Sequence, residues 1–453
     1  MKIFRRNIYK DWQVHTHFEH GKWSYWNDCI PYMNSIICFN TVSGATVLLS
    51  REQFTLFKDN PDEAPDALKE IGIIVSKDKQ EKQEWFSHYL EGKNDDSILD
   101  LTIATSMNCQ FRCVYCFEGD KAVKNLSDEA ISRIKAFVES KCPTLKKLRV
   151  VWFGGEPLLG IPQIRELSAF FINLSEKYGF SYCSDITTNG FALTEKNRGI
   201  LFNECRIHWY YITLDGTADI HDRRRPLANG KGTYDIIWRN ILQLVDMGAS
   251  VLIRVTIDKT NIGNIPLLID KIASSEIAGK IFLSFVRTMD YSFTPEAAKR
   301  TIFSVNEFAG EELRLMEYAH KNGLYSFSLP RPCPTGGCLR KGDIVIGTEG
   351  EVYKCTDTIG EKQWITGSIA VSSSNTGAQW YKEWLAWTPF TDNNKCSRCK
   401  LLPLCNGGCP HNLLFSQKKH GTDEQCPDWK YNYKSRIRLF VQEQINNNSY
   451  EEI

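Results

Sequence analysis

Three cysteines, Cys109, Cys113 and Cys116, lie close together with the spacing CX3CX2C. Three thiolates on one tight loop can hold three irons of a [4Fe–4S] cube, and a fourth would be needed to close it. The remaining iron is then open, as catalytic metal sites require. The alternative for this spacing is a zinc knuckle whose fourth ligand lies elsewhere in the chain.

A second group of cysteines crowds the C-terminal part of the chain. Its eight members are Cys333, Cys338, Cys355, Cys396, Cys399, Cys405, Cys409 and Cys426. Eight thiolates make two closed sites of four, each able to hold a [4Fe–4S] cluster, and two structural zinc ions are the alternative. The five scattered cysteines are expected to be small buried hydrophobes: Cys29, Cys38, Cys142, Cys183 and Cys205.

Composition and charge bear on whether the protein is secreted, binds nucleic acid or spans a membrane. The 453 residues include 16 cysteines, and the N-terminus leads into polar residues rather than a secretion signal. In a reducing compartment, clustered thiolates indicate metal sites rather than disulfides. The net charge of +1, without a long basic run, argues against a nucleic-acid partner. No apolar stretch is long enough for a membrane helix, so we expect a cytoplasmic protein without a membrane partner.

Four short motifs follow predicted strands. They are CX3CX2C with Tyr115 before its last cysteine, Gly154-Gly155-Glu156-Pro157, Thr187-Thr188-Asn189-Gly190, and Thr213-Leu214-Asp215-Gly216 followed by His221-Asp222-Arg223-Arg224-Arg225. Together they resemble the cysteine loop, GGE, TNG and SLDG…HDxxR motifs of the radical S-adenosylmethionine (SAM) superfamily. Thr213 replaces the usual serine and keeps its hydroxyl group.

This resemblance implies that the open iron chelates SAM and passes an electron to its sulfonium, which yields a 5′-deoxyadenosyl radical. The GGE turn would contact the methionine amino group, while Thr213 and Arg225 would hold the carboxylate or the ribose. The implied cofactor-binding residues are Tyr115, Gly154, Gly155, Glu156, Thr188, Asn189, Thr213, Asp215 and Arg225. As alternatives, the arginines form a solvated basic face and His221-Asp222 caps a helix.

The order of the seven cysteines from Cys338 to Cys426 resembles the SPASM extension of radical SAM enzymes, and Cys333 supplies an eighth thiolate. The resemblance implies two auxiliary clusters with interleaved ligands. Cys333, Cys338, Cys355 and Cys409 would hold one cluster, and Cys396, Cys399, Cys405 and Cys426 would hold the other. Fully ligated clusters would accept the electron left on a substrate radical.

Alternating strand and helix patterns predict an α/β fold, a partial (β/α)6 barrel whose parallel strands place ligands at their carboxyl ends. The predicted strands are Leu99–Thr105, Leu148–Phe153, Tyr182–Thr187, Trp209–Leu214, Val251–Ile257 and Ile281–Phe285. Before the barrel, two strands around Ser43-Gly44, a capping box at Ser50 and Gln53, and a short helix predict a winged-helix-like α+β module. A polar linker is predicted at 91–96, and the predicted domains are 1–95, 96–325 (barrel) and 326–453 (SPASM).

The resemblance implies a maturase that forms a thioether or carbon–carbon cross-link in a ribosomally made peptide. The N-terminal module would bind the leader of this precursor peptide as an added strand, and a flavodoxin- or ferredoxin-like protein would donate electrons. Alternatives are formylglycine formation in sulfatases, dehydrogenation of a small alcohol, and a non-catalytic zinc-stapled binding protein. Sulfatase-maturating enzymes carry an aspartate directly after the cysteine corresponding to Cys355. Here Thr356 follows, which leaves Asp357 as the candidate base.

Overall fold

The computed structural model describes residues 1–4, 18–116, 124–290, 294–326, 329, 332, 337–369, 374–375, 378–390, 395–414 and 426–452. The chain divides into two compact units. The barrel unit contains Asp95–Phe327 and Lys341–Glu383, and the terminal unit contains Met1–Asn94, Ser328–Arg340 and Trp384–Ile453. In contrast to the predicted division at residue 325, residues 341–383 therefore group with the barrel.

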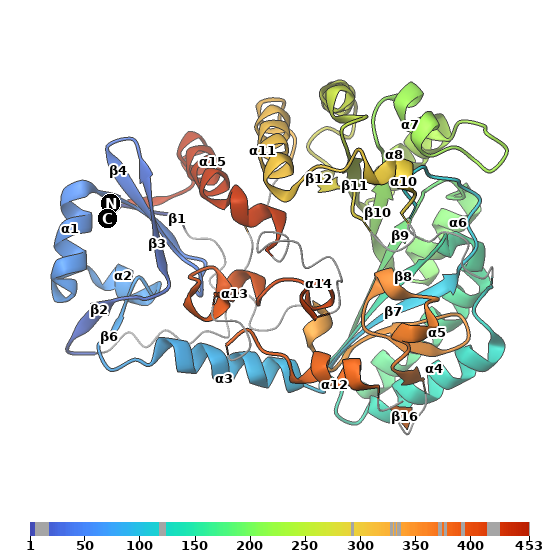
Figure 1. Cartoon of the computed structure of the whole chain (residues 1–453), viewed down its shortest axis with the longest axis horizontal. Helices are drawn as coiled ribbons and strands as arrows, with labels where there is room; N and C mark the ends of the chain where they lie inside the picture. Colours follow the sequence, from blue (N-terminus) through green and yellow to red (C-terminus); the bar gives the residue numbers. More distant parts are fainter. Residues whose placement is uncertain are drawn as a thin grey trace. The chain divides into compact units, whose positions relative to one another are not determined.

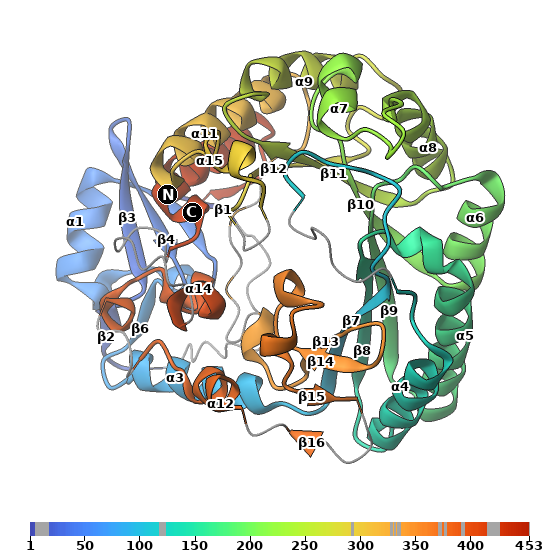
Figure 2. The same ribbon diagram turned by 45° about the vertical axis from the view of Figure 1, so that its right-hand side comes forward.

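Six parallel strands of the barrel unit pair with one another in the order of the sequence (Figure 2). They are β7 (Ile98–Ser106), β8 (Lys147–Gly154), β9 (Ser181–Thr188), β10 (Ile207–Thr213), β11 (Ser250–Ile257) and β12 (Phe282–Arg287). These bounds agree with the predicted strands to within a few residues. The α/β partial barrel expected from the sequence is confirmed.

Helices cover one face of this sheet. The main ones are α4 (Asp128–Lys141), α5 (Ile161–Tyr178), α8 (Tyr234–Asp246), α9 (Ile265–Ala273) and α11 (Val305–Lys321). Alternate strand residues such as Leu99, Leu101 and Ile103 are buried in the same core as helix residues Ile134 and Ile164. The period of two in the strands and the apolar stripes of the helices thus meet in one core. In the described part of the chain, no helix is both long and apolar enough to cross a membrane.

The sheet continues beyond β7 with strands that come late in the sequence. β13 (Asp343–Ile346) pairs with β7 in parallel, and β14 (Glu351–Tyr353) and β15 (Gly367–Ser368) follow in antiparallel order. A short β16 (Ser374–Asn375) ends this sheet. The pairing of β13 with β7 explains why residues 341–383 belong to the barrel unit.

The terminal unit contains a five-stranded sheet in which both chain ends take part (Figure 1). Its order is β17 (Glu451–Glu452), β1 (Lys2–Phe4), β5 (Thr46–Ser50), β4 (Ser35–Asn40) and β3 (Asn27–Tyr32). The predicted hairpin is formed by β4 and β5. The predicted capping box at Ser50 and Gln53 starts α1 (Arg51–Asp59).

Smaller elements complete the terminal unit. β2 (Gly21–Trp23) pairs with β6 (Ile74–Ser76), and α2 (Asp66–Glu70) lies between them in the sequence. From the C-terminal part come α12 (Gln379–Ala386), which begins in the barrel unit, α13 (Leu402–Cys405), α14 (Pro410–Leu414) and α15 (Tyr433–Asn446).

The predicted linker at 91–96 contains the boundary between the two units, which falls between Asn94 and Asp95. Its first four residues are helical, however, because helix α3 spans Glu81–Asn94. Trp85, Tyr89 and Lys93, spaced four residues apart, are buried on one face of this helix. The ammonium group of Lys93 donates to the carbonyl of Trp387 at 2.7 Å. Because its ammonium group is hydrogen-bonded, Lys93 can be buried, and the buried face of the helix extends into the polar stretch that begins at residue 91.

Candidate functional site

The loop of Cys109, Cys113 and Cys116 follows β7, at the carboxyl end of the parallel strands. A segment that follows helix α7 (Ala218–Arg224) binds it through backbone hydrogen bonds. The amide of Arg112 donates to Pro226 O at 2.8 Å, the amide of Val114 donates to Arg224 O at 3.0 Å, and Ala228 N donates to Gln110 O at 2.8 Å. Residues 224–228 therefore hold the cysteine loop along its length.

The two glycines of the GGEP turn lie against the backbone that precedes the cysteine loop. Gly154 has φ +127°, and a Cβ atom there would lie 2.2 Å from Ser106 O. A Cβ atom on Gly155 would lie 2.8 Å from the carbonyl oxygens of Met107 and Asn108. Both positions require glycine because the chain approaches itself here, which positions the turn beside the cysteines.

Burial is the largest influence on the thiols of Cys109 and Cys113. Burial, together with a smaller contribution from the neighbouring Cys116, raises the pKa of Cys109 to about 11 and that of Cys113 to about 12. The Arg225 guanidinium lowers both pKa values. Three mutually interacting sulfurs with one nearby cation fit an iron–sulfur cluster, since bound irons would supply the charge that stabilises buried thiolates.

Glu156 is fully buried and joins the end of β8 to the turn after β9. Its carboxylate accepts from the hydroxyl of Thr188 at 2.6 Å, from the amide of Asn189 at 2.7 Å and from the amide of Leu158 at 3.0 Å. Burial raises the pKa of Glu156, and these three donors counteract that rise. The Asn189 side-chain amide also lies 3.9 Å from the sulfur of Cys109.

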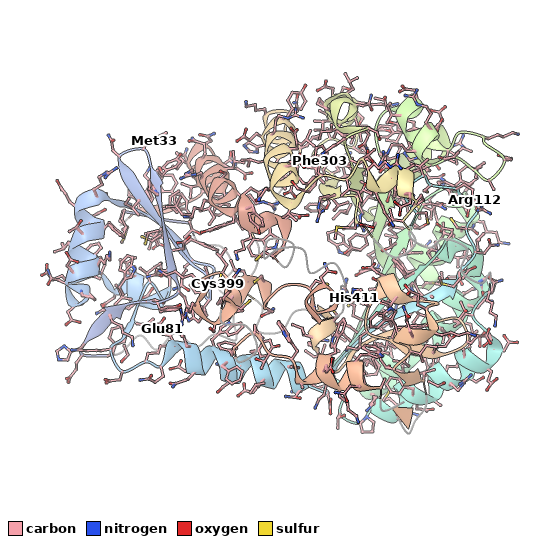
Figure 3. All side chains as sticks on the ribbon, viewed as in Figure 1. Met33, Glu81, Arg112, Phe303, Cys399 and His411 are labelled. Atoms are coloured by element: carbon pink, nitrogen blue, oxygen red, sulfur yellow. The ribbon has the colours of Figure 1, made fainter. Side chains whose placement is uncertain are left out.

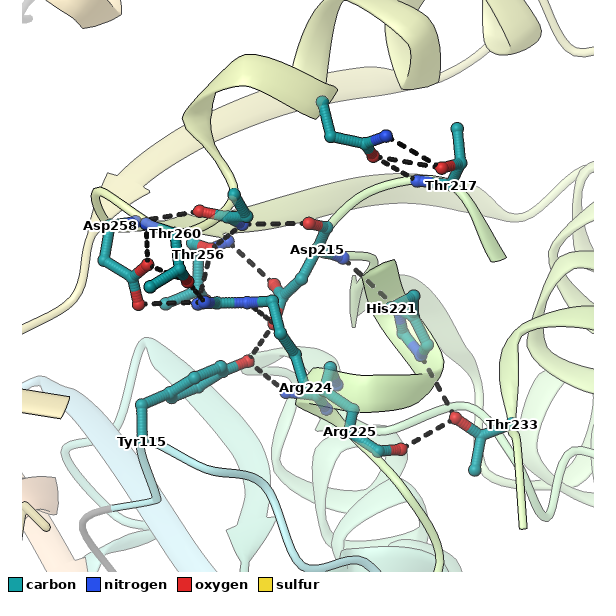
Figure 4. A network of polar contacts seen from close by, with 12 residues as sticks. Tyr115, Asp215, Thr217, His221, Arg224, Arg225, Thr233, Thr256, Asp258 and Thr260 are labelled. Atoms are coloured by element: carbon teal, nitrogen blue, oxygen red, sulfur yellow. Dashed lines mark hydrogen bonds and ion pairs between the residues drawn. The ribbon is translucent and has the colours of Figure 1, made fainter. Parts of the chain in front are cut away.

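Tyr115 connects the cysteine loop to the arginine segment (Figure 4). Its hydroxyl donates to the carboxylate of Asp215 and accepts from Arg225 at 2.7 Å. Asp215 has no exposed surface, and its second oxygen accepts from the amide of Thr256 at 3.0 Å. Among the described residues, the half-buried Thr213 hydroxyl has no hydrogen-bond partner, which leaves it available to a ligand.

Arg224, which no motif singled out, forms the centre of a buried ion-pair network (Figure 4). Its guanidinium donates to Asp258 at 2.9 Å and to the hydroxyl of Thr260 at 2.7 Å, and it lies 3.6 Å from Asp215. The guanidinium also lies 5.0 Å from the centre of the Tyr115 ring. The basic run is therefore not a uniformly solvated face: Arg224 and Arg225 are buried and Arg223 is exposed.

The His-Asp pair before these arginines supports the local fold. Asp215 N donates to Nδ1 of His221 at 3.2 Å, so His221 Nε2 carries the proton and donates to Thr233 at 3.1 Å. Burial lowers the pKa of His221 and keeps its ring neutral. The Asp222 carboxylate accepts from the amides of Thr233 and Tyr234 at the start of α8, which is a helix cap on the following helix.

Replacing Arg224 with methionine is expected to destabilise the barrel unit by about 3–5 kcal/mol, because Asp258 and Asp215 would remain buried without their cation. The measurement is the midpoint of urea unfolding followed by circular dichroism. Arg223→Met is the matched control, since Arg223 has an exposed side chain and only a 3.5 Å contact to the exposed Asp219. Equal midpoints for the two variants would show that the buried network contributes no stability.

Four cysteines of the terminal unit form a second group. Burial, together with smaller contributions from Cys399, Cys396 and Cys426, raises the pKa of Cys405 to about 12. Burial likewise raises the pKa of Cys396 to about 11. The ammonium group of Lys430 donates to the sulfur of Cys426 at 2.9 Å. Figure 3 shows Cys399, another member of this group. These four neighbouring sulfurs are the set expected to hold one auxiliary cluster.

The other expected set is divided between the units. Cys338 and Cys409 belong to the terminal unit, Cys355 belongs to the barrel unit, and Cys333 lies outside the described residues. The Cys355 thiol lies 3.7 Å from the carboxylate of the candidate base Asp357. Among the described residues, no group of three or more His, Cys, Asp or Glu side chains is arranged to hold a single metal ion. A [4Fe–4S] cluster does not need such a group, because each of its irons is bound by only one protein sulfur.

Part of the barrel unit matches a known protein family. Residues 103–272 match the model of the radical SAM superfamily. A cysteine-type anaerobic sulfatase-maturating enzyme of Clostridium novyi (strain NT) is 26% identical over 346 residues, which cover 70% of this chain and 88% of the relative. A serine-type anaerobic sulfatase-maturating enzyme of Klebsiella aerogenes is 21% identical over 340 residues, or 67% and 78% of the two chains.

A solved structure of native anSMEcpe with bound AdoMet and Kp18Cys peptide has the same fold, with a TM-score of 0.59 and 17% identity. The match covers 76% of this chain and 99% of that chain. This chain therefore contains about a quarter of its length outside the shared fold.

Proposed function

Residues 103–272 form a radical SAM domain, and on that premise we propose that this enzyme modifies a ribosomally made peptide. The reaction would be hydrogen abstraction followed by formation of an intramolecular thioether or carbon–carbon cross-link. The observation that carries the proposal is the three-cysteine loop, which residues 224–228 hold at the carboxyl ends of the strands and whose Tyr115 accepts a hydrogen bond from Arg225.

In this proposal, Cys109, Cys113 and Cys116 hold a [4Fe–4S] cluster that leaves one iron for SAM. When bound there, SAM supplies, by reductive cleavage, the 5′-deoxyadenosyl radical that abstracts hydrogen from the substrate. The guanidinium of Arg225 and the free hydroxyl of Thr213 would bind the carboxylate or the ribose of SAM. Glu156 holds the turns after β8 and β9 together, so that Gly154, Gly155, Thr188 and Asn189 keep their places beside the cysteines.

The remaining eight cysteines would bind two auxiliary clusters. Cys396, Cys399, Cys405 and Cys426 would hold one, and Cys333, Cys338, Cys355 and Cys409 the other. Since each cluster would have four protein sulfurs, neither offers an open iron to a ligand. Their role would be to take up the electron that remains on the substrate after cross-linking, and a flavodoxin- or ferredoxin-like protein would supply electrons to the SAM cluster.

Two observations support a peptide substrate. Two of the relatives are sulfatase-maturating enzymes, and the similar solved structure contains a bound peptide. The chain also carries residues beyond the shared fold, and the sheet of its N-terminal module ends in the edge strand β3. An edge strand can accept a leader peptide as an additional strand.

Formylglycine formation in a sulfatase is the second candidate, favoured by the similarity to sulfatase-maturating enzymes over most of their length. The position after Cys355 weakens it, because Thr356 stands there and Asp357, one residue later, lies within reach of the Cys355 thiol. Asp357 remains the candidate base for either reaction.

Co-expression with candidate peptides, followed by mass spectrometry, distinguishes these reactions. A cross-linked cysteine peptide loses two hydrogens and keeps its sulfur, whereas conversion of cysteine to formylglycine removes the sulfur. We expect loss of two hydrogens with a short peptide encoded nearby and no change in a sulfatase. Loss of sulfur from a sulfatase cysteine would instead establish the second candidate.

A further inference from the structure

The segments that carry the second group of cysteines are bound to the N-terminal residues of the chain. We infer that residues 1–94 are the folding platform of the cluster site formed by Cys396, Cys399, Cys405 and Cys426. This assigns positioning roles to Tyr25, Thr41 and Lys400. The inference rests on the proposed auxiliary cluster and gives the N-terminal module a function besides peptide recognition.

Hydrogen bonds anchor the chain on both sides of Cys399. Before it, the carbonyl of Arg398 accepts from the hydroxyl of Tyr25 at 3.0 Å. After it, the ammonium of Lys400 donates to the carbonyl of Asn27 at 2.6 Å, and the Lys400 carbonyl accepts from the hydroxyl of Thr41 at 2.5 Å. Cys399 is therefore held between two anchored neighbours.

An apolar cluster supports the same segment. Its buried members are Trp26, Val42, Trp85, Tyr89, Leu339, Trp387 and Leu402, and the partly buried Cys396 packs against them. Trp26, Val42, Trp85 and Tyr89 belong to the N-terminal residues, while Leu402 starts the helix that ends in Cys405. Burial of large aromatic side chains is a major source of stability in a packed core. The N-terminal residues thus supply four of the seven buried members of the cluster against which Cys396 packs.

The fourth cysteine reaches the site on a separate segment, which the module also binds. Cys426 is held by Lys430, and a few residues later the hydroxyl of Tyr433 donates to Asp28 of β3 at 2.6 Å. Arg438 on α15 donates to the carbonyl of Pro31 on the same strand at 3.2 Å. Strand β3 therefore contacts both cysteine-bearing segments, and it brings together ligands that lie far apart in the sequence.

These contacts also limit how a peptide can use β3. The carbonyls of Asn27 and Pro31 accept hydrogen bonds from Lys400 and Arg438, and Pro31 has no amide hydrogen to offer. A peptide strand that pairs along all of β3 must displace both side chains. Displacing Lys400 removes one of the two anchors that follow Cys399.

The test uses the full-length protein, reconstituted without oxygen, and the double variant Thr41→Val/Lys400→Met. Valine removes the hydroxyl donor with little change in volume, and methionine keeps the length of the lysine side chain. We expect the double variant to lose about four irons per chain, the content of one cube. It should also release iron to a chelator at least tenfold faster than the unchanged protein. Lys382→Met is the matched control, since Lys382 is exposed and lies outside these contacts.

Circular dichroism identifies a variant that fails to fold, and Tyr25→Phe then provides a milder second test with the same expected direction. If the variants keep the iron content and release rate of the Lys382→Met control, the platform inference is wrong, although the auxiliary cluster stands. If the unchanged protein contains only about four irons per chain, the content of the SAM cluster, then the auxiliary clusters are absent. The platform inference is then wrong as well.

Discussion

Replacing Cys113 with alanine is expected to abolish reductive SAM cleavage. Cys113 is partly buried, and Cys109, Cys116 and Arg225 all act on the pKa of its thiol. Removing one of three sulfurs leaves two protein ligands, too few for the proposed cluster with one open iron. The measurement is formation of 5′-deoxyadenosine by anaerobically reconstituted protein with dithionite and SAM.

Cys142→Ala provides the control for this experiment, because Cys142 is a buried cysteine outside all motifs whose thiol donates to the Val138 carbonyl at 3.3 Å. It should keep the activity of the unchanged protein. Cleavage at the normal rate in Cys113→Ala would exclude the three-cysteine loop as the cluster site.

Replacing Cys399 with alanine should separate SAM cleavage from completion of the reaction. The variant should still form 5′-deoxyadenosine, because Cys399 belongs to the terminal unit and the SAM residues belong to the barrel unit. It should lose about four irons per chain and yield no modified peptide, since the closed cluster would no longer accept the substrate electron. The measurements are iron content, 5′-deoxyadenosine formation and the mass of a co-expressed peptide.

The equivalent change Cys205→Ala removes a buried cysteine of the barrel unit outside the motifs and should leave iron content unchanged. A well-folded Cys399→Ala protein that loses cleavage and modification equally would contradict a separate auxiliary role.

The barrel could be predicted from the sequence because local patterns determine it. In each strand, apolar residues alternate with polar ones or form a continuous run, and each helix carries an apolar stripe along one face. Gly154 and Gly155 mark a close approach of backbone segments. The capping box at Ser50 is likewise a local signal that the structure confirms. The predicted strand Leu99–Thr105, which directly precedes the three cysteines, also placed them at the carboxyl end of β7.

Other features depend on long-range contacts that no local pattern contains. Arg224 is one of the undefined positions in the HDxxR motif, and its partner Asp258 is more than thirty residues away. The pairing of β13 with β7 and of β17 with β1 joins distant parts of the chain. Helix α3 extends into the first four residues of the predicted linker, where the ammonium group of Lys93 donates to the carbonyl of the distant Trp387. Only the folded chain supplies these partners.

Electron paramagnetic resonance of the reduced, anaerobic protein, recorded with and without SAM, tests the central claim most directly. A [4Fe–4S] cluster with an iron left open by Cys109, Cys113 and Cys116 should give a signal that changes when SAM binds to that iron. The Cys113→Ala variant should lack this SAM-dependent change. A signal that SAM leaves unaltered, or pure protein that contains zinc in place of iron, would contradict the account.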